Sequence, residues 1–330
     1  MAGPGGTNVV SWASDIDGKA WDEAVAALFG HPLQSAVWGR ARKRVDGIRE
    51  KRWLATTDGK PIWMIRVEER VVRGVGSIAW APRGPVGHST ESSVAIPSEF
   101  KRILRKGGFS LLSVDPWVRV SPKEQEALGS VRPMTVWLDL SKGVDALFSN
   151  FHPQLRKGIR RAERGGVEIE DVREDERIAE FVSHCTSISH RKGFELRVSK
   201  EIIQAILDES RGNPVLDAAL IVSKKDGVFG SGLFVMRLGR AMHQIWGATN
   251  RALKEDRVGE ACQWATIRWA IERGCERYDL EGIDPQNNRP VYDFKRRFNG
   301  DEVFLHGMAN HPLDLRGRAL ALAIKLRRFW

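Results

Sequence analysis

Apolar side chains recur at two different spacings in the first hundred residues. Helical spacing predicts one helix over residues 17–30, which begins at an aspartate suited to cap it and stops at a glycine, and a second helix over 35–44. Beyond the Asp-Gly turn at 58–59, residues 62–72 alternate as in a strand, and a further strand ends at Trp80. The pattern predicts two helices followed by an antiparallel meander.

The same order recurs in the second half of the chain. Helical spacing over 174–190 and 200–209 precedes strands over 216–222 and 228–238, which an Asp-Gly turn joins, and a strand that closes on Trp246. Two copies of one fold explain the repetition. Coincidence is the alternative, because Asp-Gly hairpin turns are common.

A helix over residues 259–273 and a strand over 277–280 follow the second meander. A strand, a helix and a strand after an antiparallel meander are the elements of an acyltransferase fold of the GNAT type. The fold class is therefore predicted to be α/β, with mixed central sheets.

Composition indicates a folded protein of about two domains. The 330 residues are 42% hydrophobic and 28% charged. Three scattered cysteines, Cys185, Cys262 and Cys275, provide neither a disulfide framework nor the paired spacing of a zinc site. The sequence shows no secretory signal and no apolar run long enough to span a membrane, and a cytoplasmic location is expected.

The charge is strongly basic. Lys and Arg number 52 against 42 Asp and Glu, which gives a net charge of +10. This excess favours a polyanionic partner: a nucleic acid, a nucleotide-linked substrate or an anionic membrane surface. Residues 313–330 predict a basic amphipathic helix, which can either pack onto its own protein or lie on an anionic bilayer.

Four stretches together resemble the FemABX family of peptidyltransferases. They are residues 33–39 (LQSAVWG), 80–86 (WAPRGPV), 155–167 (LRKGIRRAERGGV), and 278–283 (YDLEGI) followed by 292–298 (YDFKRRF). Each stretch is a weak signal alone, but their order spans most of the chain from about residue 30 to residue 300.

This resemblance implies two tandem GNAT-like domains. The first, over 1–138 and completed by a C-terminal helix over 312–330, would bind the acceptor, and the second, over 139–311, would bind the donor. The implied reaction adds an amino acid from aminoacyl-tRNA to an amine on the stem peptide of a peptidoglycan precursor, either lipid II or UDP-MurNAc-pentapeptide. The resemblance implies aminoacyl-tRNA as the co-substrate, with no cofactor and no metal. We expect a monomer, with peripheral contact to the inner face of the plasma membrane through the basic C-terminal helix.

Such a transfer needs no covalent nucleophile, because the tRNA ester is already activated. Position and electrostatics can provide much of the acceleration. The resemblance places the family's reaction-centre lysine at Lys295, which can hold a phosphate or the developing oxyanion. Asp279 ends a core strand nearby and can accept the amine's proton or orient Lys295. The plain alternatives are a solvated basic stretch and a loop cap.

The remaining candidate residues divide between donor and acceptor. Donor candidates add phosphate affinity or wall the pocket, and acceptor candidates include arginines that can clamp a diphosphate or carboxylates. The donor or tRNA candidates are Arg296, Arg297, Arg156, Arg160, Trp246 and Gly247, and the acceptor candidates are Trp38, Arg42, Lys43 and Arg197. The family often has an aromatic residue four positions after Arg197, where this chain has Glu201, which leaves the acceptor open.

Three alternatives remain. An acetyl-CoA-dependent GNAT enzyme would bind pyrophosphate at residues 256–261 (DRVGEA). The pyrophosphate-binding loop of such enzymes begins with Arg or Gln, and this chain has an aspartate at that position. Relatives that aminoacylate natural-product intermediates would keep the chemistry and change the acceptor. A non-enzymatic RNA-binding protein would bind tRNA whether or not it carries an amino acid.

Overall fold

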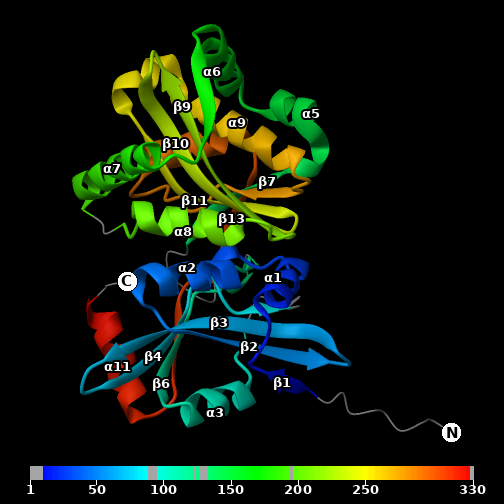
Figure 1. Ribbon diagram of the computed structural model, residues 1–330, viewed down its shortest axis with the longest axis vertical. Coiled ribbons are helices and arrows are strands. Elements are labelled where there is room, and N and C mark those ends of the chain that lie inside the picture. The colour runs from blue at the N-terminus through cyan, green and yellow to red at the C-terminus, as the bar shows by residue number, and fades with distance from the viewer. Residues whose placement is uncertain (1–9, 88–94, 122, 126–132, 194–195, 328–330) are drawn as a thin grey trace, which may run out of the picture. The chain divides into compact units, whose positions relative to one another are not determined.

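The chain folds into two compact units (Figure 1). The computed structural model describes residues 10–87, 95–121, 123–125, 133–193 and 196–327. Unit 1 comprises Met1–Ser130 and Leu305–Trp330, and unit 2 comprises Val131–Phe304. Each unit is built on one mixed β-sheet.

Unit 1 has the strand order β1-β2-β3-β4-β6-β14, with β5 paired to β3. Neighbours are antiparallel except β4 and β6, which are parallel. Its elements are β1 (Ser11–Ala13), α1 (Gly18–Ala27), the 3-10 helix η1 (Pro32–Gln34), α2 (Ala36–Asp46), β2 (Glu50–Thr57), β3 (Lys60–Val72), β4 (Gly76–Ala81), β5 (Val86–Gly87), α3 (Ser98–Lys106), β6 (Phe109–Val114), β14 (Ala309–Pro312) and α11 (Leu315–Arg327).

Unit 2 has the strand order β13-β7-β12-β11-β10-β9-β8, and only β11 and β12 are parallel. Its elements are β7 (Met134–Asp139), η2 (Leu140–Lys142), α5 (Gly143–Asn150), α6 (Pro153–Arg164), β8 (Val167–Val172), α7 (Asp175–Lys192), α8 (Lys200–Ser210), β9 (Leu216–Lys225), β10 (Val228–Leu238), β11 (Ala241–Thr249), η3 (Arg251–Asp256), α9 (Val258–Glu272), β12 (Arg277–Asp279), α10 (Arg289–Lys295), η4 (Arg296–Phe298) and β13 (Asp301–Phe304).

The two units repeat one topology, as the sequence pattern predicts. Two helices, three antiparallel strands, a helix and a parallel strand follow one another as α1-α2-β2-β3-β4-α3-β6 and as α7-α8-β9-β10-β11-α9-β12. The match extends to the sheet edges, because β1 pairs with β2 as β8 pairs with β9. Likewise β14 lies antiparallel to β6 as β7 does to β12.

Local chemistry explains why these elements begin and turn where they do. The Asp17 carboxylate accepts hydrogen bonds from the backbone N–H groups of Lys19 and Ala20 and so caps α1. The Ser35 hydroxyl caps α2 in the same way. Both Asp-Gly turns have positive φ at both residues, at 58–59 and 226–227, which is the conformation that tight hairpins require.

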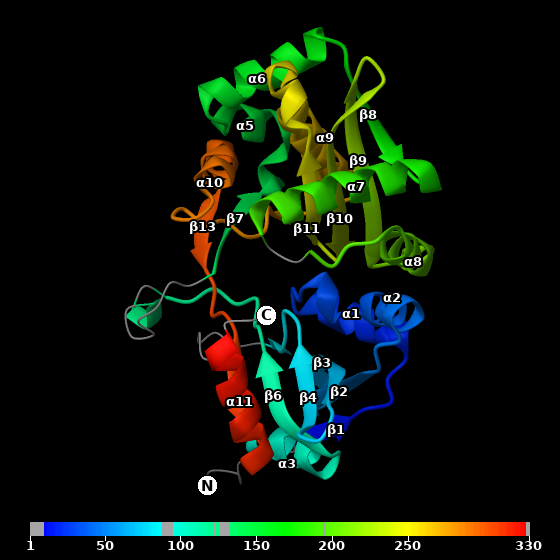
Figure 2. The same cartoon turned by 90° about the vertical axis from the view of Figure 1, so that its left-hand side faces the viewer.

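The sheet of unit 1 is covered on both faces. Successive strand side chains point to opposite faces, so Ala79 packs with α3 residues such as Phe100, while its neighbour Ile78 packs with Leu111 and Leu320 of α11. Figure 2 shows α11 lying along β6. The C-terminal helix therefore covers the part of the other face that β4, β6 and β14 form.

The unit boundaries differ from the expected ones. The expected end of the first domain, residue 138, lies inside β7, and the expected end of the second, residue 311, lies inside β14. In the structure β7 pairs with β12 and β13, and β14 pairs with β6. Unit 2 consequently begins at Val131 and ends at Phe304. Long-range pairing decides both boundaries, and local periodicity does not reveal it.

We expect Gly317→Ala to destabilise unit 1 by about 1–3 kcal/mol. A Cβ at Gly317 would lie 1.8 Å from the Ser110 carbonyl oxygen, so α11 would have to move away from β6. Urea denaturation followed by tryptophan fluorescence measures the change. Gly259→Ala is the matched control, since a Cβ there meets nothing closer than Thr249 at 3.8 Å. Equal midpoints for the two variants would contradict the tight contact.

Candidate active site

The parallel strand pair in the middle of the unit 2 sheet separates early. Ala241–His243 of β11 pair with Arg277–Asp279 of β12, but β11 continues to Thr249. The register of β11 against β10 shifts where Phe234 and Val235 lie opposite, so β11 is irregular near the point of separation. In the described part of the chain, no strand pairs with this edge of β11 beyond His243. An unpaired strand edge can bind an extended ligand.

Lys295 lies close to the end of β12. It is the last residue of α10, is buried with 8% exposure, and its Nζ donates hydrogen bonds to the carbonyl oxygens of Glu281 (2.9 Å) and Gly282 (3.0 Å). An ammonium carries three donors. Among the described residues the third has no partner, so Lys295 retains one N–H for a bound molecule.

Burial lowers the pKa of Lys295 to about 8, because desolvation disfavours the charged form. The Glu281 and Asp279 carboxylates act in the opposite sense but do not outweigh desolvation. At neutral pH most molecules therefore carry the ammonium, and the neutral amine becomes accessible slightly above it. A metal ion bound by the Glu281 and Asp279 carboxylates would be repelled by the positive charge of Lys295.

Asp279 is fully buried and holds the turn after β12 in place. Its carboxylate accepts hydrogen bonds from the Thr135 hydroxyl, from Trp137 Nε1 (2.7 Å) and from the backbone N–H of Glu281 (2.7 Å). Glu281 in turn accepts from Lys295 through its carbonyl. The structure thus brings the two predicted residues together through Glu281. Three donors on one carboxylate favour a positioning role for Asp279 over proton uptake.

His243 and Glu281 belong to the same cluster, and neither was predicted from the sequence. His243 is buried, and its Nδ1 lies 3.3 Å from Glu281 Oε1 and 3.8 Å from Asp279 Oδ2. Glu281 has a positive φ of 59°, which is uncommon for a residue with a side chain. A histidine inside an apolar strand was a signal for His243, but its register opposite Asp279 comes only from the sheet.

The two β11 candidates differ in environment. Trp246 is buried and stacks on Phe234 with ring centroids 5.4 Å apart, as a core aromatic does. Gly247 is exposed, and a Cβ there would lie 2.9 Å from Gln244 Nε2 and 3.0 Å from Leu233 Cδ2. The absence of a side chain at Gly247 keeps this part of β11 uncrowded.

A carboxylate occupies the start of α9, where GNAT enzymes that use acyl-CoA bind pyrophosphate. Glu260 lies in the first turn, is buried, and its Oε1 is 3.4 Å from Arg257 Nη1. Helix α6 covers the same turn, since a Cβ at Gly158 would lie 3.4 Å from Glu260 Cγ. The positive end of the helix dipole already faces a negative charge, so an anionic ligand would have to displace it.

Helix α6 presents its cations to solvent. Its buried face consists of Leu155, Gly158, Ile159 and Ala162, while Arg160 is exposed and lies over the Phe148 ring, and Arg156 is half-buried. In η4, Arg296 is exposed and lies over the Tyr292 ring. Arg297 is half-buried, and its carbonyl accepts the N–H of His152 at 2.8 Å, which ties η4 to the start of α6.

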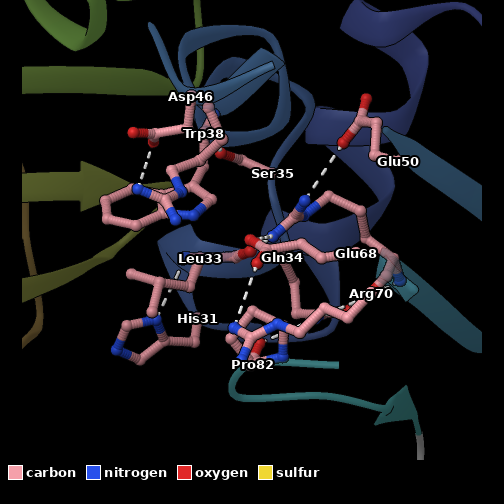
Figure 3. A network of polar contacts seen from close by, with 12 residues as sticks. His31, Leu33, Gln34, Ser35, Trp38, Asp46, Glu50, Glu68, Arg70 and Pro82 are labelled. Atoms are coloured by element: carbon pink, nitrogen blue, oxygen red, sulfur yellow. Dashed lines mark hydrogen bonds and ion pairs between the residues drawn. The ribbon is translucent and has the colours of Figure 1, made fainter. Parts of the chain in front are cut away.

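Unit 1 contains a buried polar network, and the acceptor candidate Trp38 lies near it (Figure 3). At its centre Arg66 is fully buried and donates to the Leu33 carbonyl (3.0 Å), Glu50 (3.2 Å) and Glu68 (3.1 Å). Burial by itself would raise the pKa of Glu68, but the guanidiniums around it, Arg66 first, hold that pKa below its usual value. The Gln34 side chain forms hydrogen bonds with the backbone of Arg66 and Pro82 and so connects η1 to β3 and to the turn after β4.

The four acceptor candidates differ in how far they are buried. Arg42 is buried and forms an ion pair with Asp46, whereas Lys43 is exposed. Trp38 is also buried, on the first turns of α2. Arg197 lies in unit 2, exposed, on the segment between α7 and α8. Lys43 and Arg197 are thus the two of these four side chains that reach solvent.

Comparisons with known proteins agree with the observed topology. A sequence model of the acetyltransferase (GNAT) domain matches residues 149–296. The structure of FemX superposes with a TM-score of 0.77 at 17% identity, covering 96% of this chain and all of that one. L-PGS from Bacillus licheniformis gives 0.55 at 12% identity, covering 94% and 96%, and a tandem GNAT protein from the clavulanic acid biosynthesis pathway gives 0.53 at 13%, covering 93% and 99%. A search of curated proteins found no match.

These findings confirm the predicted fold. The chain has the tandem GNAT-like fold of FemX, with two mixed sheets, and its second unit carries a domain of the GNAT acyltransferase type. At such low identities the structural likeness concerns the fold. Substrate and donor therefore depend on this chain's own residues.

Proposed function

We propose that this chain transfers an aminoacyl group from aminoacyl-tRNA to an amine on the stem peptide of a peptidoglycan precursor, without a cofactor. The observation that carries the proposal is Lys295, a buried ammonium with one donor left, which is held by the segment after β12, where β12 ceases to pair with β11. A fixed positive charge in a site from which water is excluded stabilises an oxyanion far better than the same charge in water.

The reaction needs little else from the protein. The neutral amine of the acceptor attacks the ester carbon of the aminoacyl-tRNA, the oxyanion of the tetrahedral adduct accepts the third N–H of Lys295, and collapse releases the 3′ hydroxyl of the tRNA. The proton lost by the amine passes to the leaving oxygen. Asp279 acts as a positioning residue, because it holds Glu281, whose carbonyl holds Lys295.

The exposed cations of unit 2 suit the tRNA. Arg160 on α6 and Arg296 on η4 are exposed and offer contacts for phosphates, and the half-buried Arg156 lies on the same helix as Arg160. Because phosphate binding releases counterions, binding of tRNA should weaken steeply as salt rises. On the acceptor side, Lys43 of unit 1 and Arg197 of unit 2 are exposed cations, each of which can bind a diphosphate or peptide carboxylates. Within unit 1, Trp38 and the Arg42–Asp46 pair would support the surface around Lys43.

An acetyl-CoA-dependent acyltransferase is the second candidate. The GNAT match over residues 149–296 favours it. The ion pair of Glu260 with Arg257 at the start of α9, and the cover that α6 provides there, favour the tRNA donor instead. A pyrophosphate at that helix end would meet the Glu260 carboxylate at close range.

One experiment separates these functions. The purified chain is incubated with mixed labelled aminoacyl-tRNAs and with UDP-linked or lipid-linked muropeptide, and a parallel reaction receives labelled acetyl-CoA. We expect label in the peptide only from the tRNA donor. Transfer from acetyl-CoA alone would contradict the proposal, as would tRNA binding with no transfer to any amine. Transfer from tRNA to small amines but not to muropeptides would retain the donor and replace the acceptor.

The pH dependence of transfer should carry the signature of Lys295. The rate rises with pH as the acceptor amine loses its proton, and we expect the slope to decrease at about pH 8, where Lys295 loses its own. Initial rates, corrected for spontaneous ester hydrolysis, measure the profile. In Lys295→Arg the side chain stays charged, so any residual activity should rise without this break. A break that persists in that variant would belong to another group.

A further inference from the structure

Helix α11 has two apolar faces, although a surface helix needs one. Its inner face includes Gly317 and Leu320, which pack against β6 and the neighbouring core. A second set of apolar side chains, Leu315, Leu322 and Leu326, is 78%, 57% and 74% exposed. Among the described residues these are three of the larger apolar side chains that remain in solvent, and all three lie on one short helix.

The exposed leucines form a stripe. With Ala319 they occupy positions i, i+4, i+7 and i+11, which at 100° per residue fall within an arc of about 60°. Leu320 lies on the opposite side of the same helix. The stripe therefore points directly away from the sheet that α11 covers, and no described segment of unit 1 buries it.

Cations flank this stripe on both sides. Arg318 and Lys325 lie beside it in one direction and Arg316 in the other, and all three are exposed. Helix α11 contains no acidic residue. Within the part of the chain that the structure describes, none of these three cations forms an ion pair. Their charge is thus available to an external anion.

We propose that the outer face of α11 docks onto an anionic lipid bilayer, with the leucine stripe among the acyl chains and the flanking cations at the phosphate level. A helix with leucines between cations is the arrangement that lies in a membrane interface. A second copy of the chain is a poorer occupant, because pairing two stripes would bring both sets of cations together.

The helix would lie in the plane of the membrane. Its 13 residues reach about 20 Å, short of the hydrocarbon thickness of about 30 Å. In the described chain, no helix combines the length and the apolar character needed to cross a bilayer. Peripheral contact through α11 places the protein at a surface where anionic lipids and lipid-linked molecules are concentrated.

Flotation with vesicles tests this docking. The full chain is mixed with vesicles of phosphatidylcholine alone or with one third phosphatidylglycerol, and bound protein is measured at low and at physiological salt. We expect binding to the anionic vesicles that weakens with salt, and at least tenfold weaker binding to neutral vesicles. No binding to anionic vesicles at low salt would overturn the proposal.

Two pairs of substitutions assign the contact to α11. Leu322→Ser with Leu326→Ser should weaken binding at least tenfold, and Arg318→Gln with Lys325→Gln should weaken it about fivefold for each cation removed. The matched controls remove the same groups elsewhere: Ile169→Ser with Val228→Ser, and Arg102→Gln with Arg105→Gln on α3, which covers the opposite face of the unit 1 sheet. Equal losses in variants and controls would contradict a site on α11.

A fluorescent label reports insertion directly. The three native cysteines are buried, and burial raises their thiol pKa values to between about 11 and about 12, so a cysteine introduced at the surface reacts selectively. A polarity-sensitive label at Ala319→Cys should shift to the blue on anionic vesicles, while one at Arg102→Cys should not. An unshifted label, or a dimer in ultracentrifugation that the leucine substitutions disperse, would assign the stripe to another partner.

This inference is independent of the proposed reaction. Vesicle binding is measured without tRNA or peptide, and transfer to a soluble UDP-linked acceptor is measured without lipid. The leucine variants should keep transfer to the soluble acceptor unchanged. Failure of either assay leaves the other interpretable.

Discussion

Lys295→Ala is expected to lower the kcat of aminoacyl transfer at least about 100-fold, which is the usual loss when one oxyanion donor is removed from a site that excludes water. Nothing in the observed cluster replaces the lost charge, because Asp279 and Glu281 are carboxylates and His243 faces both of them. The loss is measured as the rate at which label appears in the muropeptide at a saturating concentration of aminoacyl-tRNA.

Two controls show whether the loss belongs to this ammonium. Lys142→Ala removes an exposed lysine of the same unit, which is paired only with Asp139, and should leave kcat unchanged. Lys295→Arg retains the charge but not the shape, and should retain part of the activity at most. Turnover by Lys295→Ala within threefold of the parent chain would remove Lys295 from the reaction.

The same substitution should leave the fold intact. The charged form of Lys295 is disfavoured in the folded state, and a shift from 10.5 to about 8 corresponds to a cost of about 3 kcal/mol at neutral pH. That cost is present below pH 8, declines between pH 8 and 10.5, and is absent above. Removing the side chain relieves the cost but leaves the Glu281 and Gly282 carbonyls without their donor. The unfolding free energy should therefore change by less than about 2 kcal/mol.

Arg66→Met is expected to destabilise unit 1 by about 3–5 kcal/mol, the usual cost when one partner of a buried ion pair is removed. Arg66 is fully buried, and its loss leaves the buried Glu68 carboxylate, among the described residues, with the weaker compensation of Arg42 and Arg70. Urea denaturation at pH 7 measures the change in the unfolding free energy.

Compensating and matched variants test this explanation. Adding Glu68→Leu to Arg66→Met should recover much of the loss, because no buried charge then remains unpaired at that position. Arg49→Met breaks the exposed pair with Glu69 and should cost less than about 1 kcal/mol. A double variant as unstable as Arg66→Met would indicate that packing of the arginine, and not charge, holds η1 and α2 in place.

Acid should reveal the same network. The pKa of Glu68 is below its ordinary value in the folded state, so its contribution to stability is present above that ordinary value and is lost as the pH falls through the folded one. Arg66→Met removes the main guanidinium that stabilises the ionised Glu68. The unfolding free energy of this variant should therefore fall less between neutral and acidic pH than that of the parent chain.

Local chemistry in the sequence was sufficient for much of the fold. These features are short-range: helix caps at Asp17 and Ser35, Asp-Gly turns with positive φ, and the change from helical spacing to alternation. Each depends on residues close together in the chain, so it can be predicted without any tertiary contact. Their repetition predicted the two copies that the structure contains. The resemblance also singled out Lys295 and Asp279, which the structure brings together.

Tertiary structure alone decided the rest. The sequence could not show that β7 pairs with β12 of unit 2 or that β14 pairs with β6 of unit 1, which moves both expected boundaries. Nor could it show that His243 lies opposite Asp279, or that Arg42 is buried in an ion pair while Lys43 is exposed. It also left open whether α11 packs onto the protein or offers an apolar face to a membrane, and the structure shows a helix that packs on one side and exposes leucines on the other. Pairing between distant strands sets these features, because the spacing of side chains along the chain records which face of an element is apolar but not which element will cover it.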